Sequence, residues 1–110
     1  MSARLAVAVA AGLITLGMSP SMAAGPTINV RLFQFRPAQV QVAANSEVMW
    51  ANDDDIKHTV TSGSPERPDG RFDLELGEKG ATGRFRFAQP GVYPYFCNRH
   101  QHMRGEVRVN

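Results

Sequence analysis

The segment YPYFCNRHQHMRG, residues 93–105, holds a thiol, an imidazole and a thioether within a few positions of one another. These groups belong to Cys97, His100 and Met103, and they lie between two alternating apolar runs, so we expect them on a short loop between strands. A further imidazole, His58, begins an earlier run of this kind. Two imidazoles, a thiolate and a weak thioether are the ligand set of copper electron-transfer centres. The sequence therefore predicts a copper site formed by His58, Cys97, His100 and Met103.

The same donors leave alternatives open. A Cys-His-His set also accepts zinc, with Met103 as a poor fourth ligand. Cys97 as a buried structural thiol and Met103 as a core residue are the plainer interpretations of each residue alone. His102 is a weaker candidate ligand, and we expect it in solvent. Haem attachment and iron–sulfur clusters are disfavoured because both need more cysteines than the single one in this chain.

Two-residue periodicity runs through most of the remaining chain and predicts strands with one apolar face. Phe33 and Phe35 fall out of step with Ile28 and Val30, which predicts a bulge or bend near Leu32. Within residues 25–110, no window of ten or more residues shows convincing helical periodicity. Strands are expected near residues 27–35, 38–43, 46–51, 58–62, 72–76, 83–88, 91–97 and 105–109.

These short strands, separated by Gly, Pro, Asn and Ser, predict an all-β fold, an antiparallel Greek-key β-sandwich of seven or eight strands. We expect its core to include most of the aromatic side chains, namely Phe35, Trp50, Phe72, Phe85, Phe87 and Tyr95.

Residues 1–24 read as a secretory signal peptide that precedes a single domain, residues 25–110. Arg4 is followed by an apolar run over residues 5–18 and then by small residues, with cleavage expected after Ala23 or Ala24. A retained membrane anchor is the alternative, but the apolar run is shorter than the roughly 20 residues that a span needs.

Composition excludes several classes of function. The formal net charge is only +2, whereas nucleic-acid binding favours a strong basic surplus. A catalytic metal needs an open coordination position, which four ligands on one copper do not leave. Three histidines are also too few for the extra copper clusters of an oxidase. We therefore expect no enzyme activity and no nucleic-acid partner.

The run over residues 90–97, followed by the spacing Cys97-x-x-His100-x-x-Met103, resembles the cupredoxins, and the short loop most resembles that of amicyanins. The resemblance implies a Greek-key sandwich, one type 1 copper, one-electron transfer and export to the periplasm. Asn98-Arg99 stands where the family usually has Thr-Pro. Thr59 stands where the family usually has an asparagine that ties the two ligand loops together, and we expect it to make one such hydrogen bond.

Together these features predict an exported soluble one-electron carrier whose copper cycles between Cu(I) and Cu(II). The alternative is a copper-binding module for storage or delivery. We expect a monomer, not inserted in the membrane after cleavage, that docks redox proteins transiently near His100. Arg99, Gln101, His102 and Arg104 would surround the contact. The acidic run over residues 53–55 is expected to be a solvated loop, with a weaker case as a docking patch.

Overall fold

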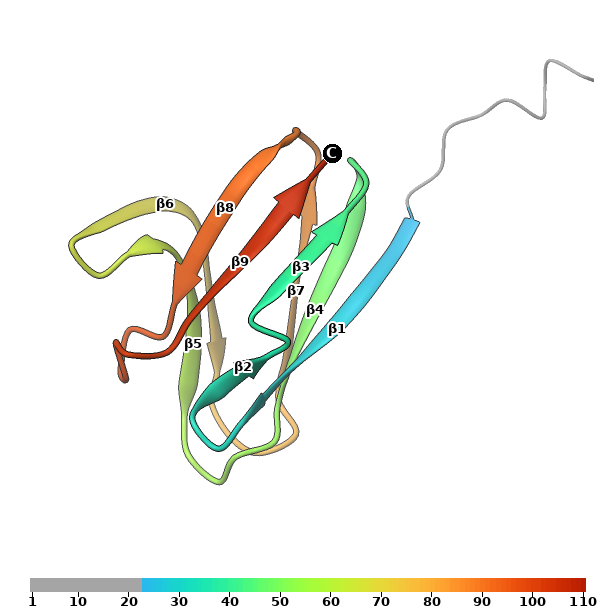
Figure 1. Ribbon diagram of the computed structural model, residues 1–110. Coiled ribbons are helices and arrows are strands. Elements are labelled where there is room, and N and C mark those ends of the chain that lie inside the picture. The colour runs from blue at the N-terminus through green and yellow to red at the C-terminus, as the bar shows by residue number, and fades with distance from the viewer. Residues whose placement is uncertain (1–22) are drawn as a thin grey trace, which may run out of the picture.

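The computed structural model describes residues 23–110, which fold into two packed β-sheets (Figure 1). The strands in this part of the chain are β1 (Ala23–Arg31), β2 (Gln34–Arg36), β3 (Gln39–Val42), β4 (Ser46–Asn52), β5 (His58–Ser64), β6 (Arg67–Leu76), β7 (Thr82–Phe87), β8 (Gly91–Phe96) and β9 (Arg104–Val109). All but the last two residues of the expected signal peptide lie outside the described residues, so its cleavage stays a prediction.

One sheet has the order β2-β1-β4-β7 and the other the order β3-β9-β8-β5-β6. β5 and β6 form a hairpin, the chain crosses to β7 in the other sheet, and it returns at β8, which lies beside β5. Such crossings between sheets are typical of Greek-key sandwiches. The all-β class is confirmed, with nine strands rather than seven or eight. Within residues 23–110, no helix is long and apolar enough to cross a membrane.

The bulge or bend expected near Leu32 is a two-residue turn in the structure. Leu32 and Phe33 alone join β1 to β2, and Arg31 faces Gln34 across the hairpin. This turn divides the expected strand over residues 27–35 into two antiparallel strands. A turn of this kind shifts the alternation as a bulge would, which is why periodicity alone did not separate the two.

The sheets are also less uniformly antiparallel than expected, since β1 pairs in parallel with β4, and β3 with β9. β2 and β3 run in the same general direction on either side of Pro37 (Figure 1). Only two reversals of direction therefore lie between β1 and β4, which makes them parallel. An apolar–polar alternation carries no information on strand direction.

β6 begins at Arg67, well before the expected start at residue 72. The segment after Gly63 lies between two expected strands, but it extends the β5–β6 hairpin through the pairs Gly63–Pro68 and Ser64–Arg67. Proline is tolerated in this strand because β6 is an edge strand, where a missing N–H need not break a ladder on the open side.

The core lies between the sheets and is rich in aromatic side chains, as expected. Trp50 is fully buried and contacts Tyr95 edge to face, with ring centroids 5.4 Å apart. Phe85 is only partly buried but packs against the same cluster. The other buried aromatic residues of the cluster are Phe35, Phe72, Phe87 and Tyr93.

Tyr95 on β8 lies across Gly105, its partner in β9. The ring is buried, and its burial raises the pKa of the hydroxyl to about 12. A β-carbon at residue 105 would overlap the ring and hydroxyl of Tyr95. Glycine is therefore required here for close packing between strands rather than for backbone freedom.

Gly105→Ala should lower the free energy of unfolding of the metal-free protein by about 1–3 kcal/mol, the usual cost of overpacking. Urea unfolding measures this change. Gly77→Ala is the matched control, because nothing lies within 4 Å of a β-carbon placed there. Equal stability of the two variants would contradict the packing role of Gly105.

Candidate metal centre

Three of the four predicted ligands meet at one end of the sandwich. The Sγ atom of Cys97 lies 3.7 Å from Nδ1 of His58 and 3.7 Å from Nδ1 of His100. The three donor atoms all lie within 4.8 Å of one another. His58 begins β5, whereas Cys97 and His100 belong to the loop between β8 and β9. The fold thus joins residues that the sequence places some 40 positions apart.

The separations of these atoms suit a bound metal ion. One ion could reach the sulfur and either nitrogen at 3.7 Å, since metal–sulfur and metal–imidazole bonds are about 2.3 and 2.0–2.1 Å for zinc. A trigonal His₂Cys arrangement with a weak axial ligand is the arrangement of electron-transfer copper sites. The donor set of this chain therefore fits such a metal.

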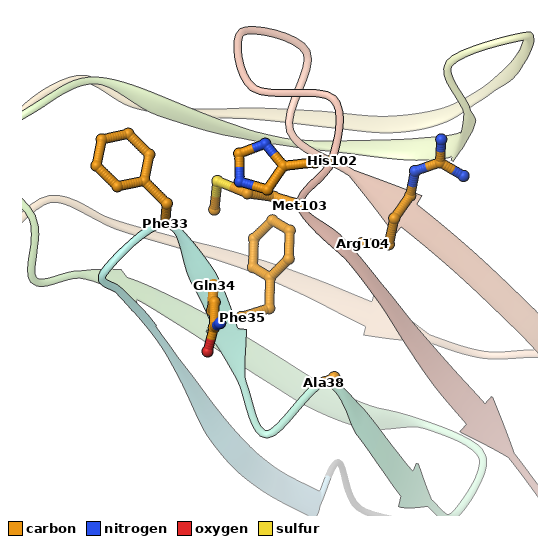
Figure 2. Close-up of a pocket in the computed structure, with 7 residues that line it drawn as sticks. All are labelled: Phe33, Gln34, Phe35, Ala38, His102, Met103 and Arg104. Carbon is orange, nitrogen blue, oxygen red and sulfur yellow. The ribbon is translucent and has the colours of Figure 1, made fainter.

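Met103 closes the same loop. Its carbonyl accepts a hydrogen bond from the Cys97 N–H at 3.2 Å, and its own N–H donates to the His100 carbonyl at 2.9 Å. The side chain is only 2% exposed. Figure 2 shows it pointing toward the turn that carries Phe33, a residue that contacts both histidine rings. Met103 is thus buried next to the turn whose Phe33 ring contacts both histidines.

Asp54 fixes which ring nitrogen of His58 carries the proton. The Nε2 atom of this fully buried imidazole lies 2.8 Å from Oδ2 of Asp54, a carboxylate that is 11% exposed. Because Nε2–H donates to the carboxylate, Nδ1 keeps its lone pair and directs it toward Cys97. A carboxylate behind a ligating histidine is a recurrent way to set the tautomer and orientation of the ring.

The carboxylate of Asp54 has two further donors, the backbone N–H groups of Leu32 and Phe33. Burial alone would raise the pKa of Asp54, but these two hydrogen bonds and His58 outweigh it, so the pKa is lowered. The expectation of a solvated acidic loop is wrong for this residue, since its carboxylate is satisfied from inside the protein. Asp53 and Asp55, in contrast, are exposed.

A family model for copper binding proteins of the plastocyanin/azurin family matches residues 22–110. The chain belongs to this family. Copper is therefore its cofactor, as the donor set predicted, and the resemblance to cupredoxins is confirmed. The family is one of copper-binding proteins, which agrees with the expectation that the chain is not an enzyme.

Individual relatives show the same affiliation. Amicyanin-alpha of Methylorubrum extorquens is 26% identical over 116 residues, which cover 94% of this chain and 98% of that protein. A chloroplastic plastocyanin of Tetradesmus obliquus is 31% identical over 107 residues, covering 86% of this chain and 73% of that one. Among solved structures, a purple cupredoxin from Nitrosopumilus maritimus has a TM-score of 0.71 at 23% identity, over 78% of this chain and all of the other. That structure shares the fold.

Thr59 makes the hydrogen bond between the two ligand segments that the cupredoxin resemblance led us to expect. Its Oγ1 accepts the Asn98 N–H at 2.8 Å, and its own N–H points at the Cys97 sulfur at 3.4 Å. Threonine therefore joins β5 to the ligand loop through one side-chain hydrogen bond, as predicted.

The hydroxyl of Thr59 belongs to a chain of hydrogen bonds in which each donor and acceptor can be assigned. Oγ1 of Thr61 donates to the carboxylate of Asp73 at 2.9 Å, because a carboxylate only accepts. The Thr59 hydroxyl, 2.9 Å from that of Thr61, must therefore donate to it. This leaves a lone pair of Thr59 for the Asn98 N–H. Asp73 on β6 thus orients the group that holds the ligand loop.

His100 is half-buried and lies at the edge of the site. Burial, and then the neighbouring His58, Arg99 and His102, lower the pKa of His100. The neutral ring, which is the form that binds a metal, is therefore favoured. His102 is exposed, as expected, and borders a surface pocket of about 200 Å³ next to Met103 (Figure 2).

Sequence reasoning brought out the four proposed ligands but missed Asp54 and Phe33. Asp54 stands four residues before His58, a spacing that offered a weak signal for the pair. Phe33 carried no chemical signal, and only the fold brings its ring within 5.3 Å of the His58 ring and 5.0 Å of the His100 ring, centroid to centroid.

Asp54→Asn should weaken copper affinity by about 10–100-fold, the usual effect of losing a hydrogen-bonded partner behind a ligand. The side-chain amide of asparagine has one acceptor oxygen, whereas three N–H groups point at the two oxygens of the wild-type carboxylate. Competition with a chelator of known affinity measures the change. Asp55→Asn, an exposed neighbour, is the control. Unchanged affinity in Asp54→Asn would contradict the role assigned to this carboxylate.

The same variant has a pH signature in the metal-free protein. The pKa of Asp54 is lowered from 3.8 in the folded state, so its stabilisation is present above that pH and is lost as the pH falls through the lowered pKa. The difference in unfolding free energy between wild type and variant should therefore narrow in acid.

Proposed function

We propose that this chain is an exported one-electron carrier in which His58, Cys97, His100 and Met103 hold one type 1 copper. The observation that carries the proposal is the convergence of the Cys97 sulfur with both Nδ1 atoms at 3.7 Å in an enclosed site. Copper supplies the change between Cu(I) and Cu(II). The protein residues supply a site that changes little while this occurs.

Several contacts support a rigid site. Cys97 and His58 are fully buried, and Asp54 holds the second nitrogen of His58. The loop itself is closed by the hydrogen bonds between Cys97, His100 and Met103. Donors fixed in this way need not move when the charge of the metal changes, which lowers the barrier to electron transfer.

The alternative of copper storage or delivery is less well supported. Copper transfer requires donors that an incoming chaperone or ligand can reach. Here His100 alone of the four proposed ligands is more than marginally exposed, while Met103 and the other two are buried. A closed site of this kind favours retention of the metal, as a carrier needs.

We propose that redox partners dock transiently on the surface around His100. Arg99, Gln101, His102 and Arg104 are exposed there, as the sequence led us to expect. A basic rim favours a partner with an acidic surface and gives association rates that fall with salt. Arg104 is already engaged weakly, 3.9 Å from Glu66, so Arg99 is the stronger candidate for such a contact.

We further propose that the chain is exported to the periplasm, released by cleavage after Ala23 or Ala24, and active there as a monomer of residues 25–110 without membrane insertion. The support is the order of a basic residue, an apolar run and small residues at the N-terminus. The export proposal rests on the sequence alone.

Cu(II) added to the purified mature protein should produce a strong visible absorption band from thiolate-to-copper charge transfer. Cys97→Ala should abolish that band, because it removes the only thiol. Visible absorption spectroscopy with metal analysis checks both. A protein that stays colourless with copper and takes up zinc instead would contradict the proposed function.

Met103→Leu should shift the reduction potential while copper is still held, since a weak thioether ligand would tune the potential and the other three proposed ligands would bind most firmly. Cyclic voltammetry measures the shift. Met49→Leu is a control of the same chemistry on β4, away from the ligand loop. Identical potentials for the two variants would remove Met103 from the proposed ligand set.

A further inference from the structure

The turn between β1 and β2 is strained. Leu32 and Phe33 have φ angles of 53° and 59°, in the left-handed region that bulky residues rarely adopt. A two-residue hairpin turn with both angles positive normally carries Asn-Gly. Burial does not explain the choice at Leu32, whose side chain is 65% exposed. Backbone strain of this kind concentrates where a site requires it.

The strained turn is fastened to the metal centre by Asp54. Oδ1 accepts the Leu32 N–H at 2.7 Å, and Oδ2 accepts the Phe33 N–H at 3.0 Å. The same Oδ2 lies 2.8 Å from Nε2 of His58. One carboxylate therefore sets both the conformation of the turn and the orientation of a proposed ligand.

This turn places the ring of Phe33 against the two histidines of the proposed metal site. It meets the His58 ring edge on at 87° and the His100 ring at 83°. These two imidazoles come from β5 and from the ligand loop, so a single side chain spans both parts of the site. Phe33 also lines the pocket next to Met103 (Figure 2). It is 39% exposed and thus forms part of the outer cover of the centre.

We propose that Phe33 is a positioning residue of the metal centre, and that the strained turn exists to hold its ring against both histidines. This inference rests on the proposed copper site. A ring packed edge on against two imidazoles restricts their rotation and keeps water from the metal on that side. Loss of the ring should therefore let a ligand rotate away and speed the release of copper.

The turn offers a pair of variants that separate strain from ring contact. Leu32→Asn and Phe33→Gly each install the residue that this turn type prefers. Leu32→Asn should therefore leave the metal-free protein as stable as wild type or more so, whereas Phe33→Gly also loses the packing of the ring. Leu32→Asn keeps the aromatic ring and should release copper at the wild-type rate. Phe33→Gly should release it about 10-fold faster, an effect comparable with the loss of other groups that orient ligands.

The measurement is copper retained over time against excess chelator, determined by metal analysis, together with urea unfolding of the metal-free protein. No partner protein is present, so a role of Phe33 in docking alone would leave the release rate unchanged. Ring-proton chemical shifts of His58 and His100 in the metal-free protein report the contact directly, and they should move in Phe33→Gly but not in Leu32→Asn.

Equal release rates for Phe33→Gly, Leu32→Asn and wild type would overturn the inference. Should Phe33→Gly not fold, Phe33→Leu decides, since it keeps apolar bulk but lacks the ring. Faster release from that variant supports the inference, and a wild-type rate overturns it. A wild-type protein that binds no copper would instead defeat the proposed function, so the two failures are distinguishable.

Discussion

Three N–H donors converge on the Asp54 carboxylate, and the metal centre depends on that convergence. A neutral imidazole carries one proton and one lone pair. If nothing held the proton of His58 on Nε2, it could reside on Nδ1, where it would point at Cys97 and block a metal. The hydrogen bond of 2.8 Å to Asp54 prevents this. The two backbone donors from Leu32 and Phe33 in turn keep the carboxylate ionised and in place.

Sequence reasoning could find the proposed ligands because most of the pattern that identifies them lies in one short segment. Cys97, His100 and Met103 lie on one loop, and their chemistry names a class of metal whatever the surrounding fold. Asp54 was misread because its backbone partners lie 21 and 22 positions earlier in the chain. Composition shows three successive aspartates but cannot show which one faces inward. That distinction is made by the loop after β4, where the Asn52 side chain accepts the Asp54 N–H.

The fold class followed from periodicity, whereas strand direction and the turn at Leu32 did not. Alternation reports which side of a strand is buried, and it reads the same for parallel and antiparallel neighbours. The turn was hidden for a different reason. Leu32 and Phe33 carry none of the Gly or Asn chemistry by which two-residue turns are recognised. Functional demands on Phe33 explain that absence, since the residue best suited to the turn has no ring to offer the histidines.

The first two residues of β5, His58 and Thr59, both connect the ligand loop to carboxylates elsewhere in the fold. The ring of His58 is hydrogen-bonded to Asp54. The hydroxyl of Thr59 donates to that of Thr61, which in turn donates to Asp73. Each path ends on a carboxylate, so both favour positive charge at the metal. Asp54 has the larger effect, because its charge is nearly enclosed, whereas Asp73 and Arg99 are exposed and screened by water and salt. In the docking proposed above, the basic residues around His100 therefore act mainly on encounter with a partner, and the carboxylate of Asp54 acts mainly on the centre itself.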